Sequence, residues 1–166
     1  MKIRVFTDGA CSDNPGPGGW AAVFNIKNKC IKISGCEEDT TNNRMELSAV
    51  VNVLNKIISW ENHYGNTYEI YSDSAYVVNA INNCWIVKWK MNGWKTTKEK
   101  DVKNKDLWEE CYKLLNAIKK LKVNVKFIKV KGHSGNTFNE LVDKIAKEES
   151  LKAKKKSISK VGVTND

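Results

Sequence analysis

The stretch TDGACSDNPGPGGW, residues 7–20, places a carboxylate at the end of an apolar strand and then reverses the chain. The preceding residues 3–7, IRVFT, have the β-branched and aromatic composition that is typical of a strand. The prolines and glycines at 15–19 predict a turn that leads into a second strand. Because an unpaired buried carboxylate is energetically costly, Asp8 is expected to have partners elsewhere in the fold.

Hydrophobic spacing predicts the elements around this turn. Three strands joined by short polar or turn-rich connections favour antiparallel pairing, and they are expected at 2–8, 20–27 and 29–36. The remaining elements alternate between helix and strand: helix 43–60, strand 68–73, helix 74–81, helix 106–121, strand 123–130 and helix 138–153. This order, βββαβααβα with one or more short helices at 85–105, predicts a mixed sheet, because strands separated by helices pair in parallel.

Composition limits the class of protein. A chain of 166 residues with 41% hydrophobic content is expected to form one domain with a filled core. It has no apolar run of about 18 residues and no signal-peptide core at its start, so we expect a cytoplasmic protein without a membrane span. Its five cysteines form no CxxC pair, which favours reduced thiols over disulfides or a zinc site.

The positive charge is confined to two segments. The net charge is +9, and residues 85–105 carry seven lysines against two acidic residues. Residues 150–166 carry five lysines against Asp166, and the rest of the chain is neutral. A localised basic surface predicts a polyanionic partner. We expect one domain over 1–153 and a disordered tail over 154–166, whose lysines give weak attraction or solubility.

Three further acidic residues could join Asp8. Asp73 ends a predicted strand, and ligands of open α/β sheets bind at the carboxyl ends of strands. Glu46 lies in the first turn of the first predicted helix. Asp143 lies on the last predicted helix, on the same face as Asn139 four residues earlier.

Each carboxylate also has an ordinary structural interpretation: an Asx-turn at Asp8, a capping box of Asn43 with Glu46, a helix cap at Asp73, and an ion pair of Asp143 with Lys147. Taken together, however, clustered carboxylates repel one another unless a divalent cation binds them. Oxygen ligands of this kind suit Mg²⁺ or Mn²⁺ rather than zinc. Two such ions can support phosphodiester cleavage.

Five motifs resemble bacterial-type ribonuclease H, type 1, in the order found in that family: TDGACSDNPGPGGWAAV, TTNNRMEL, YSDSAYVVNAI, WKMNGWKT with VKNKDLW, and VKGHSGNTFNELVD. The resemblance implies an α/β ribonuclease H-like fold, with a five-stranded mixed sheet in core order βββαβαβα and a basic helical protrusion. It implies a monomeric endoribonuclease that hydrolyses the RNA strand of RNA–DNA hybrids with two Mg²⁺ ions, for which Mn²⁺ can substitute. The expected products carry 5′-phosphate and 3′-hydroxyl groups.

The resemblance also assigns site residues. It places the metal-binding carboxylates at Asp8, Glu46, Asp73 and Asp143, and a loop histidine at His133, which could otherwise be a solvated residue. Contacts with the nucleic acid are implied at Cys11, Asn14, Thr41, Asn42, Asn43 and Asn139, although Asn42 or Asn43 could equally cap the following helix. In the protrusion they are implied at Trp85, Lys88, Trp89, Lys90, Trp94, Lys95 and Lys98, where the tryptophans could also pack the protrusion against the body.

Two other classes of protein are considered. A module that binds hybrids without cleaving them would have no need of four clustered carboxylates near phosphates. A ribonuclease H domain of a reverse transcriptase is disfavoured by the initial methionine, the full basic protrusion and the basic tail, so we expect a free-standing enzyme.

Overall fold

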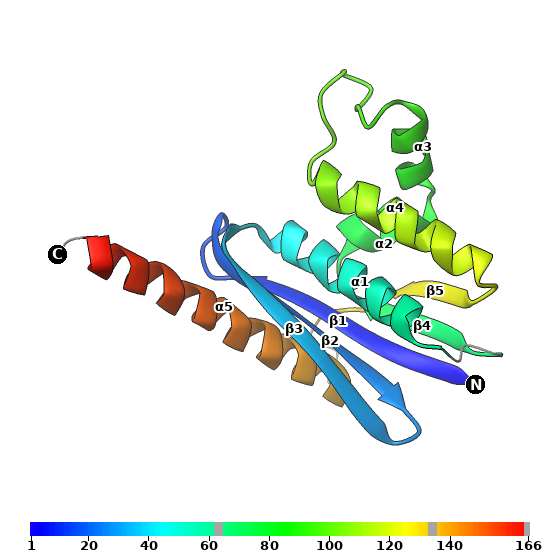
Figure 1. The fold of residues 1–166 in the computed structure, drawn as a ribbon, viewed down its shortest axis with the longest axis horizontal. Coiled ribbons are helices and arrows are strands. Elements are labelled where there is room, and N and C mark those ends of the chain that lie inside the picture. The colour runs from blue at the N-terminus through cyan, green and yellow to red at the C-terminus, as the bar shows by residue number, and fades with distance from the viewer. Residues whose placement is uncertain (62–64, 133–135, 165–166) are drawn as a thin grey trace.

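The computed structural model describes residues 1–61, 65–132 and 136–164, and the side chains only as far as residue 160. Its centre is a five-stranded mixed sheet in the order β3-β2-β1-β4-β5 (Figure 1). β1 pairs antiparallel with β2 and parallel with β4; β2–β3 is antiparallel and β4–β5 is parallel. The strands are β1 (Lys2–Cys11), β2 (Gly16–Ile26), β3 (Lys29–Thr40), β4 (Thr67–Ser72) and β5 (Asn124–Lys129).

Helices cover the two faces of the sheet unequally. Figure 1 shows α1 and α4 on one face and α5 on the other, with α3 in a protrusion above α4. The helices are α1 (Asn42–Ser59), α2 (Ala75–Asn82), α3 (Trp85–Met91), α4 (Lys105–Lys120) and α5 (Thr137–Thr164). Along the chain, three helices therefore follow β4 and precede β5, which agrees with the prediction of extra helical structure at 85–105.

The alternation of β1 divides the core into two parts. Ile3 and Val5 point toward α1 and join the larger apolar cluster, which includes the buried Trp108 of α4. Phe6 points to the opposite face and joins a smaller cluster with residues of β2 and α5. Asp8 follows Phe6 by two residues, so the strand directs its carboxylate toward the α5 side.

The expected sheet is confirmed, but the expected tail is wrong. α5 continues without a break from Thr137 to Thr164, through most of the segment 154–166 that was predicted to be disordered. Lysine and alanine are good helix formers, and Ala153 is fully buried against the body. The side chain of Lys160 also forms an ion pair with Glu38 of β3 at 2.8 Å. The charge of the lysine run predicts disorder, but these contacts with distant parts of the chain order it as a helix.

Within the described residues, no helix is both long enough and apolar enough to span a bilayer.

Candidate active site

Three of the four predicted carboxylates converge. Asp8, Glu46 and Asp73 each offer an oxygen within 4.8 Å of the others. Asp143 is not part of this tight group, but it lines the same pocket of about 270 Å³. The pocket is also lined by Asn139, and by Lys131 and Glu140, which the sequence did not single out. The structure therefore brings all four carboxylates to one hollow, three of them in close contact.

Parallel pairing of β1 with β4 aligns two of the carboxylates. Phe6 is the register partner of Tyr71, so Asp8 and Asp73 each lie two residues beyond a paired position. Asp73 is not the cap of the following helix, because the hydroxyl of Ser74 takes that role and accepts a hydrogen bond from the Val77 backbone at 3.2 Å. The side chain of Asp73 thus remains available to the pocket.

The third carboxylate, Glu46, is carried by α1 and is buried. The cap of α1 is Thr41, whose hydroxyl accepts a hydrogen bond from the Arg44 backbone at 3.2 Å. The alternative capping box of Asn43 with Glu46 is therefore wrong. Gly9 allows α1 to come this close to β1, since a Cβ atom at Gly9 would lie 2.5 Å from the backbone nitrogen of Glu46.

Asp143 has an additional partner on its own helix. The Lys147 ammonium contacts the Asp143 carboxylate at 2.8 Å, which is the ion pair considered from the sequence. This pair is compatible with a role in the pocket, because Asp143 is only partly exposed and faces the other carboxylates closely enough to raise the pKa of Asp8. Lys147 thus balances part of the negative charge.

The cluster is electrostatically strained when no cation is bound. Burial, followed by repulsion from Asp73, raises the pKa of Asp8 from 3.8 to about 7. Burial, followed by repulsion from Asp8, raises the pKa of Glu46 well above its ordinary value. Among the described residues, Glu46 Oε2 is buried and has no hydrogen-bond partner. An unpartnered buried carboxylate oxygen beside two further carboxylates fits a divalent cation with oxygen ligands.

This strain predicts how stability depends on pH. Between about pH 4 and pH 7 the folded chain retains a proton on Asp8 that the unfolded chain releases, so the free energy of unfolding falls as pH rises. A fully expressed shift of this size corresponds to about 4 kcal/mol. In chelator, thermal melts should therefore give a lower Tm at about pH 7 than at about pH 5. Added Mg²⁺ should raise the Tm at the higher pH, and a Tm that is unaffected by pH and by Mg²⁺ would contradict the strained cluster.

The residues expected to contact the RNA strand lie around the start of α1. Asn14, in the connection between β1 and β2, accepts a hydrogen bond from the Asn42 backbone at 3.2 Å. Asn42 and Asn43 are exposed, and neither is the helix cap. Cys11 is partly exposed, and burial raises the pKa of its thiol. These side chains form one polar surface beside the pocket.

The protrusion, residues 85–105, contains two tryptophans that pack against aromatic side chains of α4 and one that is exposed. Trp89 contacts Trp108 edge-on, with a centroid distance of 5.4 Å. Trp94 is only 8% exposed and contacts Tyr112, so burial leaves it little surface for a nucleic acid. Trp85 is 40% exposed. Among the predicted lysines, Lys88, Lys90 and Lys98 are exposed, and Lys95 forms an ion pair with Asp101.

Arg44 was not singled out from the sequence, yet it links α1 to the protrusion. Its guanidinium forms two hydrogen bonds with Asp106, at 2.9 and 2.7 Å, and one with Glu37 at 3.2 Å. A third side chain, Asn104, accepts from it at 3.5 Å. The contacts with Asp106, and then those with Glu37, raise the pKa of Arg44. Only the TTNNRMEL motif surrounding Arg44 could have drawn attention to it. The predicted His133 lies outside the described residues.

Comparison with known proteins identifies related sequences. The family model described as RNase H matches residues 1–151. The ribonuclease H of Acetivibrio thermocellus is 46% identical over 155 residues, which cover 93% of this chain and 99% of that protein. The ribonuclease H of Caldicellulosiruptor saccharolyticus is 47% identical over 146 residues, which cover 88% of this chain and 94% of that protein.

Solved structures share the fold at lower identity. LC9-RNase H1, described as a type 1 RNase H with the type 2 active-site motif, aligns with a TM-score of 0.75 and 24% identity over 92% of this chain and 73% of that chain. LC11-RNase H1, solved in complex with an RNA/DNA hybrid, aligns with a TM-score of 0.64 and 21% identity over 91% of this chain and 98% of that chain. Both are similar to this chain in the arrangement of strands and helices.

Proposed function

Because the chain belongs to the ribonuclease H family, we propose that it is an endoribonuclease whose carboxylate pocket hydrolyses the RNA strand of RNA–DNA hybrids by a two-metal-ion mechanism. The products would carry 5′-phosphate and 3′-hydroxyl groups. The observation that carries this proposal is the approach of Asp8, Glu46 and Asp73 to within 4.8 Å, with one buried oxygen of Glu46 unpartnered among the described residues.

The four carboxylates would together bind Mg²⁺, or Mn²⁺ in its place. Asp8, Glu46 and Asp73 would hold the ions in the tight group, and Asp143 would act from the rim of the pocket. When bound, divalent ions supply an activated water and stabilise the charge on the leaving oxygen. The protein would hold these carboxylates oriented by β1, β4, α1 and α5, so that they ionise when a cation binds, while Lys147 restrains Asp143. His133 is proposed as a group that moves a proton or assists product release.

Discrimination between RNA and DNA must depend on the 2′-hydroxyl group. We propose that Cys11, Asn14, Asn42 and Asn43 contact the RNA strand, since amides both donate and accept hydrogen bonds. Asn139 would contribute from the rim of the pocket. Thr41 would contact the DNA strand, together with the protrusion residues Trp85, Lys88, Lys90 and Lys98. Trp89 and Lys95 would mainly support the shape of the protrusion.

All the proposed ligands come from one chain, which supports function as a monomer on a hybrid duplex. A module that only binds hybrids is the second candidate. It is disfavoured because a buried cluster that raises the pKa of Asp8 to about 7 destabilises the fold near neutral pH. A surface that only binds a nucleic acid would lose stability through such a cluster without any benefit to binding.

The experiment that tests this function uses an end-labelled RNA–DNA hybrid, duplex DNA and duplex RNA as parallel substrates. Each is incubated with the protein in Mg²⁺, in Mn²⁺ and in chelator. We expect cleavage only of the RNA strand of the hybrid, only with a divalent ion, and with 5′-phosphate ends. Cleavage that persists in chelator would contradict the metal-dependent mechanism, and binding without cleavage would favour the second candidate.

A further inference from the structure

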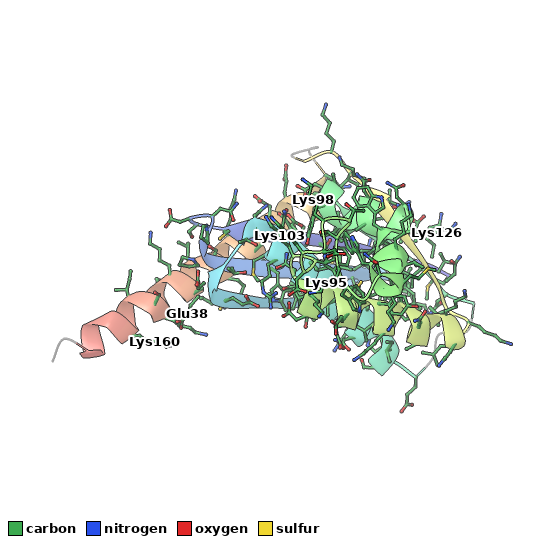
Figure 2. The ribbon with its side chains drawn as sticks, turned by 90° about the horizontal axis from the view of Figure 1, so that it is seen from above. Glu38, Lys95, Lys98, Lys103, Lys126 and Lys160 are labelled. Carbon is green, nitrogen blue, oxygen red and sulfur yellow. The ribbon has the colours of Figure 1, made fainter. Side chains whose placement is uncertain are left out.

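The C-terminal half of α5 is a second basic surface, separate from the protrusion. The family match ends at residue 151, so the lysines that follow lie outside the matched segment. Figure 2 shows Lys160 beside Glu38 at the far end of α5, well away from Lys95 and Lys98 of the protrusion. Figure 1 shows the helix extending past the edge of the sheet. The two segments that hold the excess charge of the chain therefore lie well apart on the molecule.

This part of α5 is held in a fixed direction. Ala153 is fully buried, and Lys160 is paired with Glu38 of β3. One turn earlier than Ala153, Glu149 accepts a hydrogen bond from Ser34 of β3 at 3.1 Å and pairs with Lys152 at 2.9 Å. Lysines that serve only for solubility do not need an ordered scaffold. Here the contacts with β3 fix the side of the helix that faces solvent.

One side of α5 carries a row of residues that begins at the candidate active site. Asp143, Lys147, Ser150 and Lys154 are spaced by four, three and four residues, so they lie along one side of the helix. Asp143 lines the pocket, and the Ser150 hydroxyl contacts Ser12 at 2.7 Å, in the connection that carries Asn14. The row thus runs from the pocket, through the buried Ser150 beside the connection between β1 and β2, to Lys154.

The end of the row is available to a ligand. Lys154, the last residue of the row, and Lys155, about 100° further around the helix, are both exposed, and neither forms an ion pair with any residue that the structure describes. With 1.5 Å of rise per residue, Lys154 lies about 16 Å along the helix from Asp143. For a duplex whose axis follows α5, at the B-form value of about 3.4 Å of axis per phosphate of one strand, this distance spans about five phosphates.

We propose that the C-terminal half of α5 is a second nucleic-acid contact, in which Lys154 and Lys155 bind phosphates of the hybrid about five nucleotides from the cleaved bond. The inference rests on the proposed function, because it assumes that a hybrid occupies the carboxylate pocket. Charge complementarity favours a nucleic acid as the occupant, and continuity with the pocket favours the substrate itself.

The test compares the full chain with its K154Q/K155Q variant in chelator, so that binding is measured without cleavage. Fluorescence anisotropy gives Kd for a hybrid of about 18 base pairs and for one of about six, which reaches both sites only when one of its ends lies in the pocket. We expect the variant to bind the long hybrid about three- to tenfold more weakly, with a salt slope smaller by about 1–2. The short hybrid should lose less affinity, and K154R/K155R should restore binding.

The matched control is K29Q/K32Q, which removes two exposed lysines of β3 at the opposite end of the sheet from the pocket. Equal losses of affinity in this control, or equal losses for both hybrid lengths, would overturn the proposal. It would also be overturned if K154Q/K155Q bound both hybrids as tightly as the unmodified chain and lost affinity only for anionic lipid vesicles. Cleavage of the same hybrids by the unmodified chain in Mg²⁺ is measured in parallel. Failure of that reaction would count against the proposed function, while the binding comparison would still test the contact at α5.

Discussion

Asp8→Asn is expected to abolish hybrid cleavage while leaving the chain folded. The substitution removes one charged ligand from the group that lies within 4.8 Å, and an amide is a weaker ligand for Mg²⁺ than a carboxylate. Loss of several kcal/mol of charge stabilisation in the transition state of cleavage corresponds to a rate reduction of ~10³-fold or more. Initial rates on an end-labelled hybrid, measured over a range of Mg²⁺ concentrations, would detect it.

The stability of this variant separates loss of chemistry from loss of fold. The neutral amide would remove repulsion within a cluster that raises the pKa of Asp8 to about 7, so the metal-free variant should melt no lower than the unmodified chain near neutral pH. Glu61→Gln is the matched control, since it neutralises an exposed acidic residue beyond the other end of α1. It should keep full activity, and cleavage by a folded Asp8→Asn protein at the normal rate would refute the assignment.

Gly9→Ala is expected to impair both stability and catalysis. The added Cβ would lie 2.5 Å from the Glu46 backbone nitrogen and 2.7 Å from the Met45 carbonyl carbon, so α1 must move away from β1. Overpacking of this kind costs about 1–3 kcal/mol, and a displacement of about 1 Å in a catalytic group can reduce the rate ~10²-fold. Denaturant unfolding, Mg²⁺ titration and cleavage rates would measure the three consequences.

Gly35→Ala provides the comparison for this prediction. Its Cβ would lie 2.6 Å from Nε1 and 2.8 Å from Cε2 of Trp20, so it overpacks the contact between β3 and β2. It should destabilise the protein, but it leaves α1 and the four carboxylates in place. Equal Mg²⁺ affinity and equal cleavage rates per folded molecule in the two variants would show that the approach of α1 at Gly9 has no special role.

The sequence was most informative where its pattern was local and repeated. The order of strands followed from alternation and turns, and the meeting of Asp8 with Asp73 followed from parallel pairing of their strands. Helix caps were harder to predict, because Thr41, Asn42 and Asn43 are all competent caps and only the backbone direction selects Thr41. Chemistry at strand ends was therefore easier to predict than the residue that starts a helix.

Features that depend on distant contacts were not predictable from the sequence. The lysine run after residue 153 was interpreted as disordered because its anchors, Glu38 and the surface against Ala153, are far away in the chain. Burial of Trp94 likewise depends on its contact with Tyr112 of α4. The extra ordering of α5 and the interior position of Trp94 became visible only in three dimensions.

Arg44 joins α1, β3 and α4 just two residues before Glu46, and Asn104, which it contacts, belongs to the protrusion. The point where the DNA strand is held and the point where the RNA strand is cut are, on the proposed function, parts of one rigid body. The distance between these two points is then fixed by the fold of the protein. A duplex seated on the protrusion would present the same rotational phase of its helix to the carboxylates at each encounter, whatever its base sequence.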